Sequence, residues 1–419
     1  MHRSIRPVRL AGLAVLALLC ASLSLPALAE AIGSMAAAIA APVPMPAPVP
    51  AAMSASVPTA PTIAARSAIL VDAETGQVLY ALNADERLAP ASITKIMTIL
   101  IAMEHVRAGR ISLDDEVTVS TEASLMGGSQ VYLKEREKVP VRDLLAAAAI
   151  RSANDASLAI AEHVAGTADD FVMLMNRRAA ELGMVNTHFS NPEGLDAPDH
   201  DTTAADIAIM ARELVKHPEV LEWTRTWIGK MRGGAYDLFN TNRLIVEYEG
   251  ADGLKTGHTE TAGYCLAGTA KRGDLRLVSV VMGTATDKDR VRETAKLLDY
   301  GFRNYERVKL ASAGAEVGAV RVRSAARQNV VAVAATALLP LAPRGTASEV
   351  KIEFEPMKEG LRAPIKKGQV IGRAVARHTS GAEYGSVEAL AQSHAPRANF
   401  IVRGWRAFVD LFARLFRKG

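Results

Sequence analysis

Ser92 and Lys95 are the two side chains of this sequence whose types and spacing most directly suggest chemistry. They stand three residues apart, and the apolar spacing after Pro90 predicts a helix from Ser92 to about residue 106. Residues three apart share one face of a helix, so both side chains point to one place. A serine hydroxyl is a weak nucleophile, and a lysine buried enough to lose its proton can act as its base. The pair predicts nucleophilic catalysis, although about one such spacing is expected by chance in a chain this long.

Two further motifs strengthen this interpretation, because serine enzymes that react with penicillins combine S-x-x-K, S-D-N and K-T-G. Ser152-Ala-Asn154 and Lys255-Thr-Gly257 follow Ser92 in this order, with alanine in place of the aspartate. Each has an ordinary alternative by itself: Ser152 could cap a helix, and Lys255 with Gly257 could form a surface turn. All three motifs together favour a catalytic site.

With their flanks, these motifs resemble the serine D-alanyl-D-alanine carboxypeptidases, which are low-molecular-weight penicillin-binding proteins of peptidase family S11. The similarity covers about residues 67–304, includes Asn191-Pro-Glu-Gly-Leu195, and continues more weakly toward the C-terminus. The resemblance implies hydrolysis of the terminal D-Ala-D-Ala bond of a peptidoglycan stem pentapeptide through a serine acyl-enzyme. D-alanine would be released, β-lactam antibiotics would acylate the same serine, and neither a metal nor an organic cofactor would be needed.

The resemblance also implies a role for each motif residue. Ser92 would be the nucleophile with Lys95 as its base, and Ser152 would relay a proton to the leaving amine. Asn154 would hold Lys95 and the substrate amide. The backbone N–H groups of Ser92 and His258 would form the oxyanion hole. The residues that would bind the terminal carboxylate of the substrate are Lys255, Thr256, Gly257 and Arg290.

Three other functions remain open from the sequence. A β-lactamase would use the same acylation with faster deacylation, and Glu193 is the nearest acidic candidate to activate its water. A D,D-endopeptidase would cut crosslinks with the same three motifs. A non-catalytic envelope scaffold would keep the fold with a vestigial site, although such a site need not keep all three motifs.

The elements around the motifs predict an α+β fold, in which helices flank an antiparallel sheet. A mostly helical part lies between an edge hairpin and the central strands, and the resemblance implies a β-lactamase/transpeptidase-like domain over residues 63–304. From 305 to 392, strands with alternating apolar and charged residues predict a small all-β domain. The expected elements of the first domain are a hairpin at 67–82, helices at 92–106, 155–164, 169–182, 203–216 and 290–304, and strands at 253–256, 264–270 and 275–282.

Both ends of the chain predict a location. Residues 1–29 combine a basic start, an apolar run and an Ala-Leu-Ala cleavage site, typical of a secretory signal peptide. Residues 30–62 are rich in Ala and Pro and predict a disordered tether. Residues 398–419 predict a basic, aromatic-rich amphipathic helix on an anionic membrane surface. We therefore expect an exported, peripheral protein on the periplasmic face of the inner membrane.

The remaining composition argues against other partners. The net charge is +4, and much of the excess lies at the two ends, so it does not indicate nucleic acid. After cleavage only Cys265 remains, which excludes an intramolecular disulfide and favours a buried structural thiol. Asp199, His200 and Asp201 are consecutive on a loop and seldom converge on one ion, so we predict no metal site. The sequence leaves the oligomeric state open.

Overall fold

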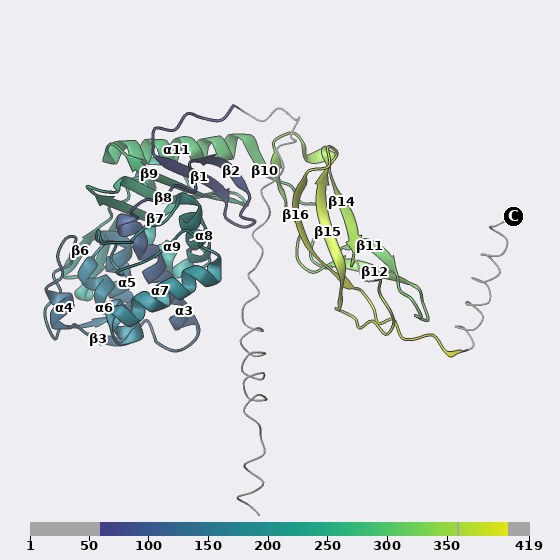
Figure 1. Ribbon diagram of the computed structural model, residues 1–419, viewed down its shortest axis with the longest axis horizontal. Coiled ribbons are helices and arrows are strands. Elements are labelled where there is room, and N and C mark those ends of the chain that lie inside the picture. The colour runs from purple at the N-terminus through teal and green to yellow at the C-terminus, as the bar shows by residue number, and fades with distance from the viewer. Residues whose placement is uncertain (1–58, 358–359, 401–419) are drawn as a thin grey trace, which may run out of the picture.

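The computed structural model of the chain describes residues 59–357 and 360–400 (Figure 1). The expected signal peptide, the expected tether up to residue 58 and the expected terminal helix from residue 401 on lie outside the described residues. Within the described ranges, no helix combines the length and the apolar character needed to cross a membrane.

A five-stranded antiparallel sheet organises the first domain, in the order β2-β1-β9-β8-β7. Side chains from its two faces pack into two separate hydrophobic cores. Leu70 and Leu277 pack toward the long helix α11, whereas Ile69, Val71 and Val280 pack toward the other helices. Figure 1 shows α11 along one face of this sheet and the helical part on the other. The strands are β1 Ser67–Asp72, β2 Val78–Leu82, β7 Ala251–Thr259, β8 Gly263–Arg272 and β9 Leu275–Thr284, and α11 is Asp287–Asn304.

The helical part is inserted between β2 and β7 and is built around α3. All residues of α3 from Lys95 to Met103 are buried, so this helix is enclosed by its neighbours rather than amphipathic. The helices are α3 Lys95–Arg107, α4 Thr121–Ser124, α5 Val141–Ala146, α6 Asn154–Ala165, α7 Ala168–Leu182, α8 Ala204–Leu214, α9 Pro218–Thr224 and α10 Leu244–Glu247. Two short hairpins complete it, β3 Glu116–Thr118 with β4 Lys138–Pro140 and β5 Ile228–Met231 with β6 Tyr236–Phe239.

The second domain is all-β, as its alternating sequence predicts. Its main sheet is antiparallel in the order β11-β12-β16-β15-β14, and a two-stranded ladder of β10 and β13 stands beside α11. Alternate side chains of the main sheet, including Val330 and Ala332, form its small apolar cores. The strands are β10 Tyr305–Arg307, β11 Glu316–Arg321, β12 Asn329–Ala334, β13 Leu341–Pro343, β14 Val350–Pro356, β15 Val370–His378 and β16 Glu383–Ala391.

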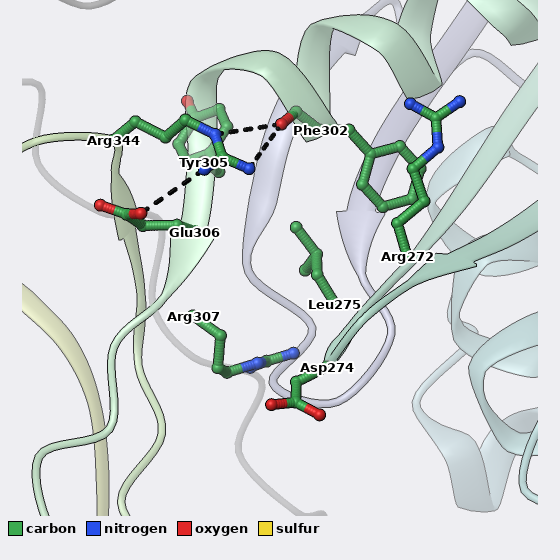
Figure 2. Close-up of a pocket in the computed structure, with 8 residues that line it drawn as sticks. All are labelled: Arg272, Asp274, Leu275, Phe302, Tyr305, Glu306, Arg307 and Arg344. Carbon is green, nitrogen blue, oxygen red and sulfur yellow. Dashed lines mark hydrogen bonds and ion pairs between the residues drawn. The ribbon is translucent and has the colours of Figure 1, made fainter. Parts of the chain in front are cut away.

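The two domains meet where α11 runs directly into β10. Arg307 of β10 pairs with Asp72 at the end of β1, with 2.6 Å between Nη2 and Oδ1, and these side chains are only 6% and 0% exposed. A cavity of about 370 Å³ lies beside this pair. Figure 2 shows its lining, in which Arg344 donates to the carbonyl of Phe302 and pairs with Glu306. The junction is therefore held by buried and half-buried ionic contacts.

Candidate active site

Ser92 and Lys95 lie on a continuous turn and helix, but not on one α-helix as predicted. Ser92 belongs to a 3₁₀ turn, η1 Ala91–Thr94, and α3 begins at Lys95. Side chains three apart eclipse each other in a 3₁₀ turn, so the shared face expected from the sequence is retained. Lys95 Nζ donates to Ser92 Oγ at 3.0 Å. The structure thus brings the expected nucleophile and its expected base into hydrogen-bond contact.

Lys95 is fully buried and has three hydrogen-bond acceptors. Besides Ser92, its Nζ donates to Asn154 Oδ1 at 2.7 Å and to the backbone carbonyl of Glu193 at 2.6 Å. Burial lowers the pKa of Lys95, and the nearby charges of Glu193 and Asp155 oppose this only in part. An amine with a lowered pKa, fixed against a serine hydroxyl, is suited to accept that hydroxyl's proton.

Ser152 lies in the connection between α5 and α6, and Asn154 is the first residue of α6. A π-helical turn, η2 Ala147–Arg151, ends at Ser152 in the left-handed conformation with φ 65°. Ala153 is the N-cap of α6, so the alternative in which Ser152 caps this helix is wrong. Asn154 Nδ2 donates to Gly127 O at 2.8 Å, which orients its carbonyl oxygen toward Lys95. A strained, non-glycine backbone of this kind is typical of functional sites.

The K-T-G motif lies on β7, the edge strand that faces the nucleophile turn. Lys255 and Thr256 are buried, and Thr256 Oγ1 lies 2.7 Å from Thr241 Oγ1. A Cβ on Gly257 would come within 3.0 Å of the Pro90 carbonyl oxygen, so the absence of a side chain lets β7 approach the turn. Burial, with the charge of Lys95 and Arg290, lowers the pKa of Lys255.

His258 and Arg290 flank this strand. The His258 ring stacks on Tyr264 of β8, with 4.0 Å between ring centroids. Arg290, from α11, donates to the backbone carbonyl of Gly257 at 2.9 Å and pairs with Asp287. Burial lowers the pKa of Arg290 from its usual range. The guanidinium therefore supports the K-T-G strand through its backbone.

The three sequence motifs did not predict that a loop, residues 190–195, would contact Lys95 and the nucleophile turn. Thr98 Oγ1 donates to the Pro192 carbonyl at 2.7 Å, and the next carbonyl, that of Glu193, accepts from Lys95. Gly194 follows with φ 87°, and a Cβ there would lie 1.9 Å from the Ala91 carbonyl oxygen. The stretch Asn191-Pro-Glu-Gly-Leu195 was the available signal, but it gave no contact partner.

His200 is a second residue whose place the sequence left open. Its Nδ1 accepts from the backbone N–H of Ser190 at 2.8 Å. Thr94 Oγ1 donates to the Ala91 carbonyl, so His200 Nε2, 2.9 Å away, must donate to Thr94. Its neighbour Asp201 instead pairs with Arg87. His200 thus ties the loop to the nucleophile turn.

The residues that meet here come from the S-x-x-K, S-x-N and K-T-G stretches, and such a set is typical of the penicillin-binding class of serine enzymes. A family model described as D-alanyl-D-alanine carboxypeptidase matches residues 53–286, and one for the C-terminal domain of penicillin-binding protein 5 matches residues 305–394. The chain therefore belongs to the D-alanyl-D-alanine carboxypeptidase family and is a serine-type carboxypeptidase. The expected family and the α+β fold with its small all-β domain are confirmed.

Individual relatives extend this similarity over most of the chain. The D-alanyl-D-alanine carboxypeptidase DacF of Bacillus subtilis is 42% identical, over 74% of this chain and 81% of the relative. The structure of penicillin-binding protein 5 from Haemophilus influenzae superposes with a TM-score of 0.75 at 35% identity, covering 81% of this chain and 99% of that one. Penicillin-binding protein D2 of Listeria monocytogenes, solved in an ampicillin-bound form, has a TM-score of 0.53 at 35% identity and covers 57% and 98%.

Proposed function

We propose that this enzyme removes the terminal D-alanine of peptidoglycan stem pentapeptides through an acyl-enzyme on Ser92, and that β-lactams acylate the same oxygen. The observation that carries the proposal is the buried Lys95 amine, 3.0 Å from Ser92 Oγ. The ampicillin-bound relative supports the second part, because its catalytic-domain fold is shared by this chain.

Acylation begins with Lys95 taking the Ser92 proton while Ser92 Oγ attacks the carbonyl carbon between the two D-alanines. The backbone N–H groups of Ser92 and His258 stabilise the oxyanion. Lys95 then returns the proton through Ser152 to the leaving nitrogen, and D-alanine departs. Water repeats the sequence on the ester: its proton passes to Lys95, its oxygen bonds to the carbonyl carbon, and Ser92 regains its hydrogen.

Recognition of a free carboxylate distinguishes a carboxypeptidase from an endopeptidase. Lys255, Thr256 and Gly257 present a buried cation and a hydroxyl along β7, and Arg290 supports that strand from behind. An ammonium that is buried among other cations is costly, and an incoming carboxylate offsets that cost. We infer that the terminal carboxylate of the substrate binds against Lys255 and Thr256, with Arg290 adding positive charge.

The test is release of D-alanine from a soluble peptide ending in Lys-D-Ala-D-Ala, together with the intact mass after penicillin. Ser92→Ala should lower peptide cleavage by about 10⁴-fold or more and abolish the penicillin adduct. A peptide with an amidated C-terminus is the matched substrate and should be cleaved poorly. Rapid penicillin turnover without peptide cleavage would indicate a β-lactamase, and an adduct without D-alanine release would indicate an endopeptidase or a scaffold.

We further propose that the protein is exported and lies on the periplasmic face of the inner membrane, anchored by residues 398–419. The support is the sequence: Trp405, Phe408 and Phe412 recur at helical steps, and the basic residues of the other side are Arg403, Arg406, Arg414, Arg417 and Lys418. Deleting residues 399–419 should leave cleavage of soluble peptides unchanged and release the protein from anionic vesicles. Vesicles of neutral lipid serve as the control, and continued retention of the truncated protein on anionic vesicles would contradict the anchor.

A further inference from the structure

The loop whose backbone bonds to Lys95 also carries the Glu193 carboxyl, which has no role in the proposed mechanism. Glu193 is 2% exposed, and its Oε1 is buried without a hydrogen-bond partner among the described residues. Its own backbone carbonyl accepts from Lys95 Nζ at 2.6 Å. The backbone N–H of Glu193 donates to its own carboxyl and favours the ionised form, but burial outweighs this bond and raises the pKa of Glu193.

The loop cannot easily move this carboxyl away. Thr98 and Lys95, both on α3, hold the carbonyls of Pro192 and Glu193, and Gly194 lies directly against Ala91. The backbone of Glu193 is therefore fixed beside the Lys95 amine. The charge of each group accordingly acts on the other.

The other charges around the pair do not replace this interaction. Asp155 of α6 also acts on Lys95, but its carboxylate already accepts from the backbone N–H groups of Val131 and Leu133. Lys255 of β7 has the same charge as Lys95. Glu162, further along α6, acts on Glu193 as a like charge. Of these carboxyls, Glu193 is thus the one whose charge acts most strongly on Lys95.

We propose that Glu193 is a positioning residue that acts through Lys95 and sets the lowest pH at which Lys95 can serve as the base. When the pair shares one proton, that proton lies either on Lys95 beside a carboxylate or on Glu193 beside a free amine. In the first form the carboxylate holds the proton on Lys95, which then cannot accept the Ser92 proton, so the free amine forms only at a higher pH, when the pair has lost this proton. The inference rests on the proposed role of Lys95.

Glu193→Gln tests it by keeping the shape of the side chain and removing its charge. Without the carboxylate, the Lys95 ammonium loses its stabilising anion and gives up its proton at lower pH. The rate of penicillin adduct formation, followed by intact mass between pH 5 and pH 9, should then show an acid limb about one pH unit or more below that of the wild type. At pH 9 the two rates should be similar, because Lys95 is neutral in both.

Two control variants separate charge from packing. Glu162→Gln removes the neighbouring carboxylate of α6 and should leave the acid limb where it is in the wild type. Glu193→Asp keeps an ionisable group and should shift the limb less than Glu193→Gln. Coinciding limbs for the wild type and Glu193→Gln would overturn the inference, as would a folded Glu193→Gln protein without an adduct at pH 9.

A measurement on the wild-type enzyme keeps the inference testable if the glutamine variant does not fold. Infrared difference spectra across the same pH range should show a protonated carboxyl band that disappears at a pH below the midpoint of the acid limb, because Glu193 ionises while Lys95 is still an ammonium. A spectrum without such a band would overturn the inference. A wild-type enzyme that forms no adduct at any pH would contradict the proposed function itself, whereas an adduct with coinciding limbs contradicts only the role of Glu193.

Discussion

At the scale of single residues, the site depends on buried polar groups whose hydrogen bonds are tied to their protonation state. Lys95 is enclosed with three acceptors, and His200 is enclosed with one donor and one acceptor. A buried hydrogen-bonded group cannot change its charge without losing partners. Protonation of either residue therefore affects the nucleophile turn, Lys95 directly and His200 through Thr94.

His200 makes the stability of the enzyme depend on pH. Burial, together with the charge of His188, lowers its pKa from 6.5 to about 4 in the folded state. Because the folded pKa is below the unfolded value, the unfolded state binds a proton between pH 6.5 and pH 4 that the folded state does not bind. The stability of the fold is therefore complete above pH 6.5 and falls as the pH drops from 6.5 to 4. The loss can reach about 3 kcal/mol. Denaturant unfolding at pH 7.5 and pH 4 should show His200→Gln, which cannot titrate, losing less stability than the wild type.

His394→Gln is the control, because His394 is exposed and lies in the second domain. It should follow the wild-type dependence on pH. If His200→Gln lost as much stability as the wild type on acidification, His200 would not be the titrating group.

At the scale of elements, the site is made where a 3₁₀ turn, a π-helical turn, an edge strand and a loop meet. Three of these adjoin or border regular elements: η1 precedes α3, η2 precedes α6, and β7 is an edge strand of the sheet. Loops and element ends carry functional groups because regular elements hold them in place. Removing one close approach between these pieces should disturb the site without unfolding the domain.

Gly194→Ala tests this close approach. The new Cβ would lie 1.9 Å from the Ala91 carbonyl oxygen, so the loop must retreat and withdraw the Glu193 carbonyl from Lys95. We expect a loss of about 2 kcal/mol or more in stability and a slower penicillin acylation.

Gly183→Ala is the matched control, because Gly183 also has a positive φ, of 80°, but open space around its Cβ position. It should cost about 1 kcal/mol from backbone strain alone and leave acylation unchanged. Equal acylation rates for the two variants would contradict the proposed function of the loop.

At the scale of the whole molecule, the ion pair between Arg307 and Asp72 joins the β domain to the sheet of the catalytic domain. Asp72 also accepts from the backbone N–H and the hydroxyl of Thr75, so both of its carboxylate oxygens accept hydrogen bonds. Arg307→Ala would leave that buried carboxylate without its cation. Breaking such a pair costs about 3–5 kcal/mol, which should lower the melting temperature and expose the domain junction to proteolysis.

Cleavage of a soluble peptide by Arg307→Ala should stay near the wild-type rate, because the pair lies outside the site. Arg303→Ala is the control, since its side chain is 77% exposed and pairs with Asp299 at the surface. A junction as resistant to proteolysis in Arg307→Ala as in the wild type would show that the pair does not hold the domains together.

The sequence by itself determined the family, the α+β class and the residues expected to do the chemistry. Those signals are local: Ser92 and Lys95 stand three residues apart, the strands alternate, and the motifs are contiguous. The tertiary structure alone decided which groups surround the amine. The bond from Lys95 to the Glu193 carbonyl spans 98 residues, and the bonds from Arg307 to Asp72 span 235. Local spacing cannot predict such contacts, because they form only when distant segments pack around one core.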